Sequence, residues 1–454
     1  MAKGSLLQFS FLKEINLLKH PFGILLRIKL WTRPDRLLFN QLSSTSTIIL
    51  FLAPVRNLTF GGQRLKGELT LATVLIHIQK LYQKKIMKKT SKQRNLLPGL
   101  LGIGASVLLM TSCHKIGDYL PGHDHSNPEL GNHKQVNLVA NNASYGAARI
   151  DPKLLNAWGI AFSGTGTPWI SSTGAGVSVI YDREGAQVLA PVNIPSPAGG
   201  TGGTPTGQVA NTSSTDFILS NGQAARFLFV NLDGVISGWN GPAGSNALLV
   251  KNRVGKAVYT GVALAQDNGQ AFLYAANALA GTIDVFDRKF DSVLTKPFTD
   301  PYLPAGYVPF NIHLVGDKLY VAYTKVGPDG RAQKHVGNGV VNIFTTGGVL
   351  LKRFADGDKL NAPWGIALAP AGFFAGKDAQ QAILVGNFGD GKINAYSPDG
   401  KFIEQLKVNN KTVAIEGLWE ISFPPATSTI DPNRLYFAAG PNDEKDGLFG
   451  YLLK

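Results

Sequence analysis

The sequence repeats itself with a period near 50 residues, and this period constrains the fold more than any other feature. The segment LNAWGIAF at 155–162 returns as LNAPWGIAL at 360–368. Weaker copies are PTGQVAN at 205–211, YTGVALA at 259–265, VPFNIHLV at 308–315 and EGLWEISF at 416–423. The steps are 49, 53, 50, 54 and 55 residues when equivalent points are taken at Gly159, Gln208, Gly261, Asn311, Gly365 and Glu420. The chain is therefore expected to contain six similar structural units.

Each unit reads as a set of short β-strands separated by turn residues. Segments such as TIDVFD at 282–287 and KINAYS at 392–397 alternate apolar and polar residues, as expected for strands with one buried face. A unit of about 50 residues with four short antiparallel strands is typical of a propeller blade. We predict an all-β fold, a six-bladed β-propeller, over residues 135–454.

The ends of this region suggest how the ring closes. The last unit supplies three clear strands, within EISFP, RLYFAAG and GLFGYLL, while QVNLVAN at 135–141 is an extra strand before the first unit. We expect this N-terminal strand to pair into the last blade, because pairing would remove an open sheet edge.

The only cysteine of the chain follows a pattern that resembles a bacterial lipoprotein signal. Residues 87–112 place a basic segment, KKTSKQR, before an apolar run that ends at Met110, and Ser112 precedes Cys113. We expect Cys113 to be lipidated, and the protein to be exported and anchored to a membrane, the outer membrane being favoured. Residues 113–134 read as a flexible tether. Residues 1–86 are interpreted as an upstream extension, with translation starting at Met87.

Charge argues against a nucleic-acid partner. The whole formal charge of +14 lies before Cys113, and from Cys113 onward the chain carries 27 basic and 27 acidic residues. The predicted propeller therefore lacks the excess of basic residues that nucleic-acid binding requires.

Several longer segments resemble a known group of propellers. FLFVNLDGVISGWN at 227–240, LVGNFGDGKINAY at 384–396 and LYFAAGPNDEKDGLFGYL at 435–452 are similar to an uncharacterised family of exported bacterial proteins. That family is similar in style to NHL-repeat and gluconolactonase-like six-bladed propellers. The resemblance covers about 136–451 and implies the fold. Gluconolactonase-like propellers imply, as an alternative, a metal-dependent hydrolase of lactones or esters.

Candidate site residues are the polar side chains near the repeat points, because inner strands line the channel of a propeller. They are Asn156, Gln208, Asn311, His313, Asn361, Glu416 and Glu420. Oxygen ligands from several blades could hold calcium, but only Glu416 and Glu420 are acidic and most others are amides, so no cofactor is expected. The recurring Trp158, Trp364 and Trp419 are interpreted as packing residues, with stacking on a flat ligand as the alternative.

The sequence favours a binding or interaction module over an enzyme, because propellers present loops on a rigid scaffold. The ligand would be an unidentified protein or glycan. Two other functions stay open, the metal-dependent lactone or ester hydrolase and a glycan-binding surface lipoprotein.

Overall fold

The computed structural model describes residues 17–20, 23–26, 58–60, 63–65, 131–374 and 381–454. The chain divides into two compact units, Met1–Asp118 and Tyr119–Lys454. The first unit contains two hairpins, made by β1 (Leu17–His20) with β2 (Gly23–Leu26) and by β3 (Leu58–Phe60) with β4 (Gln63–Leu65). The predicted signal, Cys113 and most of the predicted tether lie outside the described residues. No helix in the described ranges is long and apolar enough to cross a bilayer.

Five sheets of the second unit are each made of strands that follow one another in the chain. The first contains β7 (Ala157–Phe162), β8 (Pro168–Ser172), β9 (Val177–Tyr181) and β10 (Gln187–Asn193). The second contains β13 (Pro205–Ala210), β14 (Phe227–Asn231), β15 (Val235–Trp239) and β16 (Leu248–Asn252). The third contains β17 (Tyr259–Asp267), β18 (Gln270–Asn277) and β19 (Thr282–Asp287).

The fourth and fifth sheets repeat the same antiparallel order. They contain β20 (Tyr307–Val315), β21 (Lys318–Lys325), β22 (Val340–Phe344) and β23 (Leu350–Asp356), and then β24 (Pro363–Leu368), β25 (Ile383–Asn387), β26 (Ile393–Tyr396) and β27 (Phe402–Gln405). In each of the five, the first strand is the inner one and is hydrogen-bonded on one side only.

A further sheet combines strands from distant parts of the sequence. It contains β30 (Leu418–Ser422), β31 (Leu435–Ala439), β32 (Leu448–Leu453) and β5 (Asn132–Ala140), extended by β28 (Lys407–Val408), β29 (Lys411–Thr412) and β6 (Arg149–Ile150). β5 runs antiparallel to β32, in a register from Leu448 opposite Ala140 to Leu453 opposite Lys134.

β5 begins earlier than the sequence predicted. Its expected range was 135–141, but residues 132–134, assigned to the tether, belong to the strand. The physical reason is pairing with two other strands. Lys407 and Val408 of β28 run parallel to Asn132 and His133, and Lys134 lies opposite Leu453 of β32. His133 is buried and its ring lies 4.6 Å from that of Phe373, measured between centroids.

Short elements connect the strands. They are the 3-10 turns η1 (Ala143–Tyr145), η2 (Thr173–Ala175) and η3 (Gly241–Ala243), the single helical turn α2 (Pro441–Glu444), and the hairpin of β11 (Pro195–Ser196) with β12 (Gly199–Gly202).

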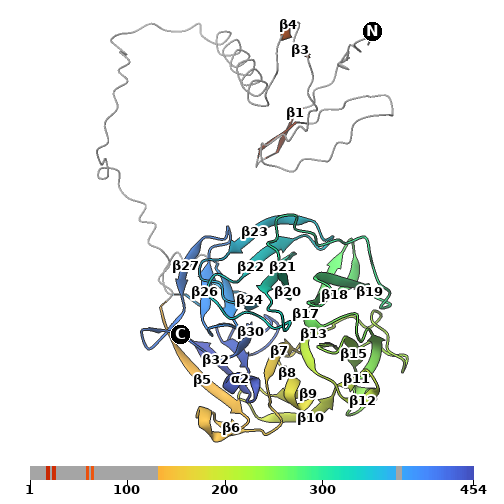
Figure 1. Cartoon of the computed structure of the whole chain (residues 1–454), viewed down its shortest axis with the longest axis vertical. Helices are drawn as coiled ribbons and strands as arrows, with labels where there is room; N and C mark the ends of the chain where they lie inside the picture. The colour runs from red at the N-terminus through yellow and green to blue at the C-terminus, as the bar shows by residue number, and fades with distance from the viewer. Residues whose placement is uncertain (1–16, 21–22, 27–57, 61–62, 66–130, 375–380) are drawn as a thin grey trace. The chain divides into compact units, whose positions relative to one another are not determined.

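The sheets are arranged around a common centre, with β7, β13, β17, β20, β24 and β30 nearest to it (Figure 1). This is a β-propeller, as the repeat predicts. Glycines of the repeat allow the inner strands to come close together. A β-carbon added at Gly365 would lie 2.7 Å from the backbone nitrogen of Ile421 in the next inner strand, which is closer than real β-carbons approach.

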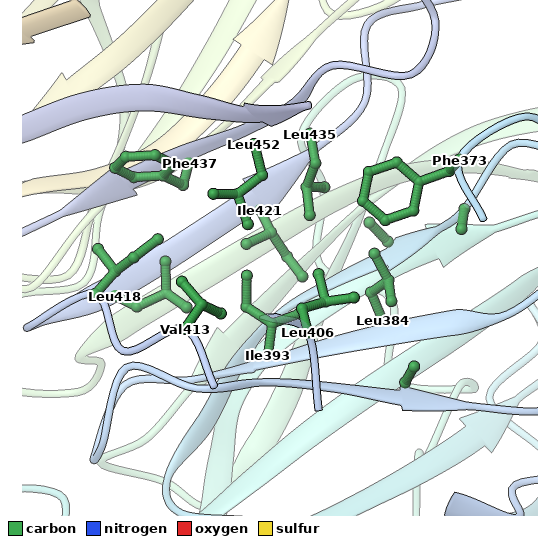
Figure 2. Packing of buried hydrophobic residues seen from close by; sticks show 14 of the residues in the cluster. Phe373, Leu384, Ile393, Leu406, Val413, Leu418, Ile421, Leu435, Phe437 and Leu452 are labelled. Atoms are coloured by element: carbon green, nitrogen blue, oxygen red, sulfur yellow. The ribbon is translucent and has the colours of Figure 1, made fainter. Parts of the chain in front are cut away.

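Apolar side chains fill the space between neighbouring sheets. Figure 2 shows one such cluster, in which Leu384 and Ile393 of the fifth sheet pack against Leu435 and Leu452 of the sheet that contains β30. All four side chains are fully buried. Burial of this kind supplies the main stabilising contribution and holds the inner strands in place around the channel.

Candidate functional site

A cavity of about 420 Å³ opens where the inner strands end. The second halves of β7, β13, β17, β20, β24 and β30 all contribute to its wall, and we call it the channel cavity. Each inner strand lies at the edge of its sheet, so its free edge offers backbone N–H and C=O groups on the channel side. The volume of the channel cavity lies within the range of about 300–1,000 Å³ that is usual for small-molecule sites.

The repeat explains why this end of the channel is open. Two residues after each repeat point, the units carry small side chains, with one exception: Ala161, Ala210, Ala263, Ala367 and Ser422, but His313 in β20. Three residues after it, five units carry a larger apolar residue that lines the cavity: Phe162, Leu264, Leu314, Leu368 and Phe423. The sequence prediction included His313 but missed the apolar set, although its constant phase in the repeat was a usable signal.

Gln208 lines the cavity, but its amide is fully engaged between the first two sheets. Its Nε2 donates to the backbone oxygens of Gly159, at 3.0 Å, and of Trp169. Its Oε1 accepts a hydrogen bond from the Ser178 hydroxyl at 2.9 Å. Gln208 therefore joins two neighbouring sheets and has little capacity left for a ligand.

Asn311 positions His313. The Asn311 Nδ2 lies 2.7 Å from His313 Nε2 and 3.2 Å from the backbone oxygen of Trp364, while its Oδ1 accepts from the Ile312 backbone N–H. His313 Nε2 also lies 3.2 Å from the backbone oxygen of Trp364, so Nε2 is engaged in either tautomer, by Asn311 as acceptor or by Trp364 as donor. Burial lowers the pKa of His313 to about 4, so the ring is neutral at pH 7.

Glu420 lies across the cavity wall from His313. The two are 3.9 Å apart, measured from Glu420 Oε1 to His313 Nε2, and the Glu420 side chain is 8% exposed. Its Oε1 accepts from the backbone N–H of Ile421, at 3.0 Å. Among the described residues, its Oε2 has no hydrogen-bond partner. Burial raises the pKa of this carboxyl well above its usual range, which favours the uncharged acid.

Three predicted site residues are not part of the channel cavity, because they precede the inner strands. Asn156 has its Oδ1 3.0 Å from Trp419 Nε1, and its Nδ2 donates to Glu444. Glu416 is exposed, and its Oε1 accepts from the backbone N–H of Asn442. Asn361 is buried and its backbone N–H donates to Asn387 Oδ1. Four of the seven candidate residues therefore line the channel cavity, namely Gln208, Asn311, His313 and Glu420, and the other three do not.

The three recurring tryptophans pack against one another. Trp158 and Trp419 are stacked with ring centroids 3.4 Å apart, and Trp364 meets both edge-on at 5.9 Å. Phe388 stacks on the other face of Trp419 at 3.8 Å. We call Trp158, Trp364, Trp419, Phe388 and Phe310 the aromatic plug. The tryptophans are at most 3% exposed, which confirms the packing interpretation over ligand stacking.

The donor set does not fit calcium. In the part of the chain that the structure describes, no group of three or more His, Cys, Asp or Glu side chains is placed to hold an ion. Glu420 is the single carboxylate of the channel cavity, whereas calcium takes six to eight oxygen ligands. The residues present therefore supply no basis for metal-assisted hydrolysis in the channel.

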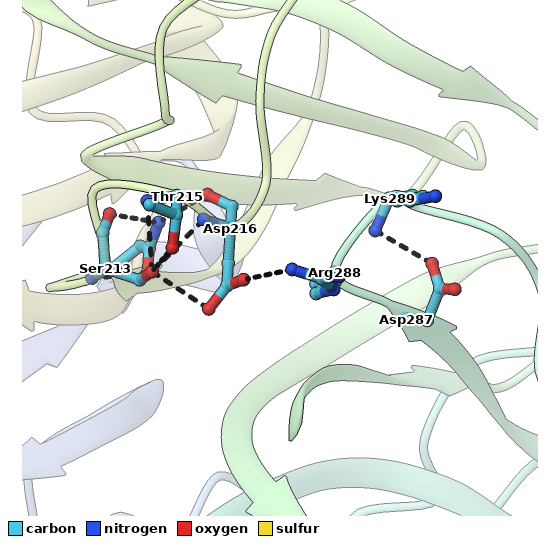
Figure 3. Close-up of polar contacts among 7 residues, drawn as sticks. Ser213, Thr215, Asp216, Asp287, Arg288 and Lys289 are labelled. Atoms are coloured by element: carbon cyan, nitrogen blue, oxygen red, sulfur yellow. Dashed lines mark hydrogen bonds and ion pairs between the residues drawn. The ribbon is translucent and has the colours of Figure 1, made fainter. Parts of the chain in front are cut away.

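A second, smaller cavity of about 250 Å³ lies at the surface, between the segment after β13 and the turn after β19. Thr215, Ile218, Arg288 and Lys289 line it. Figure 3 shows Ser213 donating to Asp216 and Arg288 pairing with the same carboxylate, at 2.9 and 3.7 Å. The Arg288–Asp216 ion pair connects the loop after β13 to the turn after β19.

Relatives of the chain were found among viral proteins, while no protein-family model matches it. The uncharacterized protein R648 of Acanthamoeba polyphaga mimivirus is 31% identical over 336 residues, covering 70% of this chain and 80% of that protein. The chain belongs to the R648 family. The mimivirus protein L690 is 30% identical over 336 residues, covering 70% of this chain and 86% of L690. These R648-family members are viral, so they give no support to the bacterial origin that the resemblance implied.

Solved structures also resemble the chain at low identity. Virginiamycin B lyase from Staphylococcus aureus has a TM-score of 0.41 at 16% identity, covering 71% of this chain and 99% of the lyase. The calcium-binding protein regucalcin from Agrobacterium tumefaciens has a TM-score of 0.41 at 13% identity, covering 66% and 90%. At such low identity, a likeness concerns the fold alone.

Proposed function

We propose that this protein is a binding module and that its site is the channel cavity. The observation that supports this function best is an open cavity of about 420 Å³ whose wall contains two polar side chains with free hydrogen-bonding capacity. These are Glu420, through Oε2, and His313, through Nδ1. Their positions on separate inner strands would fix the orientation of a small ligand.

The rigidity of the surrounding fold favours binding without a large rearrangement. Every wall strand is held by a sheet on one side and by buried apolar clusters between sheets. Preformed sites lose less conformational entropy when a ligand binds. The ligand would be small enough for this volume and would carry hydrogen-bonding groups for Glu420 and His313.

A blocking variant tests the location of the site. Leu314 lines the cavity and is 44% exposed, so Leu314→Trp would narrow the entrance without disturbing the core. Ligand-observed NMR of the full chain with a library of small neutral fragments should give hits that Leu314→Trp removes. Leu351→Trp is the matched control, because Leu351 is 46% exposed on β23 and outside the cavity. Hits that persist in Leu314→Trp, or a library without hits, would contradict the proposal.

We also propose that the propeller has six blades and that β5 closes the ring. The support is the sheet in which β5 pairs with β32, because this sheet also contains the sixth inner strand, β30. Leu138 and Val139 of β5 share a buried cluster with Ile170 and Val179 of the first sheet. In this arrangement the last blade would pack against the first.

Finally, we propose that Cys113 is lipidated and that the protein is exported and anchored to the outer membrane. The proposal depends on the order of basic, apolar and small residues in 87–112. Expression in a Gram-negative bacterium with a clickable palmitate analogue should label the wild type and not Cys113→Ser. Equal labelling of the two proteins, or none, would contradict the anchor.

A further inference from the structure

The channel cavity contains one acid and no lysine or arginine. Of the side chains that line it, only Glu420 and His313 are ionisable, and no Lys, Arg or Asp is among them. An anionic ligand would find no cation there to replace its hydration. The charges of the lining side chains therefore disfavour anionic ligands, a distinction that the cavity volume alone does not make.

In the part of the chain that the structure describes, no Lys or Arg pairs with Glu420. His313 is its nearest ionisable neighbour, at 3.9 Å, which is beyond hydrogen-bond distance. The His313 nitrogen nearer to Glu420 is already engaged by Asn311 or by the backbone oxygen of Trp364, and the ring is neutral at pH 7, so it does not balance a charge on Glu420. A buried carboxylate without a cation is costly, so a positive group that enters the cavity would complete the pair.

Three aromatic residues line the same cavity. They are Trp364, from the aromatic plug, and Phe162 and Phe423 near the entrance. Aromatic faces attract cations electrostatically, and more strongly when the cation is desolvated. The free edges of the inner strands add backbone carbonyl oxygens, which accept hydrogen bonds from an ammonium group.

We propose that the channel cavity binds a small organic ammonium ion, which pairs with Glu420 and places its hydrocarbon part against the aromatic residues. This inference rests on the proposed binding function of the same cavity. When the protonated amine meets the uncharged acid, the carboxyl O–H bond breaks and its proton passes to solvent, leaving a carboxylate paired with the ammonium. Affinity should therefore rise with pH until Glu420 is ionised in the free protein.

Three probes of the same shape test the inference: benzylamine, benzyl alcohol and benzoate, which are cationic, neutral and anionic at neutral pH. Titration calorimetry on the full chain should show benzylamine binding at least about tenfold more tightly than benzyl alcohol, and benzoate most weakly. Repeating the benzylamine titration in buffers of different ionisation enthalpy should reveal proton release.

Two substitutions complete the design. Glu420→Gln keeps the shape of the side chain and should abolish the preference for benzylamine while retaining benzyl alcohol binding. Glu416→Gln is the control, because Glu416 is exposed and lies outside the cavity; it should change neither. Melting curves of both variants establish that they fold.

The outcomes separate the two proposals. Benzyl alcohol binding as tightly as benzylamine in the wild type would overturn the ammonium ligand and leave the binding function intact. A preference for benzylamine that survives in Glu420→Gln would also overturn it. If none of the three probes binds, both proposals fail.

Discussion

The hydroxyl of Tyr145 donates a hydrogen bond to Asp446 Oδ2 at 2.6 Å, joining residues that are 301 positions apart. The other carboxylate oxygen, Oδ1, accepts from Asn141 and Asn142, at 2.7 and 3.1 Å. Tyr145 and Asn141 follow β5, whereas Asp446 precedes β32. The Asp446 carboxylate therefore links the segment that follows β5 to the segment that precedes β32.

Removing the Tyr145 hydroxyl should weaken this connection in a pH-dependent way. The hydrogen bond from Tyr145, followed by that from Asn141, lowers the pKa of Asp446. A lowered folded-state pKa means that the stabilisation is present above the unfolded value, near 3.9, and is lost as pH falls through the folded value. Tyr145→Phe should cost about 1–3 kcal/mol of unfolding free energy at neutral pH.

Denaturant unfolding at neutral and acidic pH measures this effect. The difference between the wild type and Tyr145→Phe should shrink toward the acidic limit. A constant difference at all pH values would show that the tyrosine acts through packing alone.

Deleting residues 132–140 should destabilise the propeller strongly. The deletion removes β5, the partner of β32, and exposes the edge of that strand together with the cluster that contains Leu138 and Val139. Deleting the equally long segment 114–122, in the predicted tether, should leave the melting temperature almost unchanged. Equal melting temperatures for the two deletions would contradict closure by β5.

Gly365→Ala should destabilise the ring, because the new methyl group would meet the backbone of the next inner strand. Its β-carbon would lie 2.7 Å from the Ile421 nitrogen and 2.8 Å from the Trp419 oxygen. Forced overpacking typically costs about 1–3 kcal/mol. Gly164→Ala is the control, since nothing lies within 4 Å of its added β-carbon. Thermal unfolding of both variants compares them, and a stable Gly365→Ala would mean that the inner strands can move apart.

His313→Gln should make the protein more resistant to acid. The folded-state pKa of His313 is about 4, lowered by burial from an ordinary value of 6.5. In this case the unfolded chain binds a proton that the folded one does not, so wild-type stability falls between pH 6.5 and 4. The accumulated loss is about 3 kcal/mol, from about 1.4 kcal/mol for each pH unit.

Urea unfolding over that pH range checks the prediction. In a plot of unfolding free energy against pH, the variant should lack the part of the slope that comes from His313. The opposite contribution of Glu420 is common to both proteins. Parallel curves would show that the pKa of His313 is the same in the folded and unfolded states.

The 50-residue repeat determined the propeller fold and the level of each repeat point along its strand. Equivalent phases in the repeat predict that Gln208, Asn311 and Glu420 lie in one layer, because the units share one strand geometry. The same reasoning located β30–β32 and, within a few residues, β5. The extra residues 132–134 of β5 depend on pairing with β28, a contact between segments far apart in the sequence.

Tertiary structure decided which polar groups are free and which aromatic side chains pack together. A repeat predicts the position of a side chain along the channel axis. The contacts of that side chain depend on which residues of the neighbouring sheets lie at the same position. Ser178 and Trp169 engage the Gln208 amide, and Trp158, Trp364 and Trp419 meet in the aromatic plug, from units up to 261 residues apart. Glu420 keeps a free oxygen because the backbone N–H of Ile421 engages only its Oε1. Local sequence fixes the repeat, whereas the radial packing of whole sheets fixes the site.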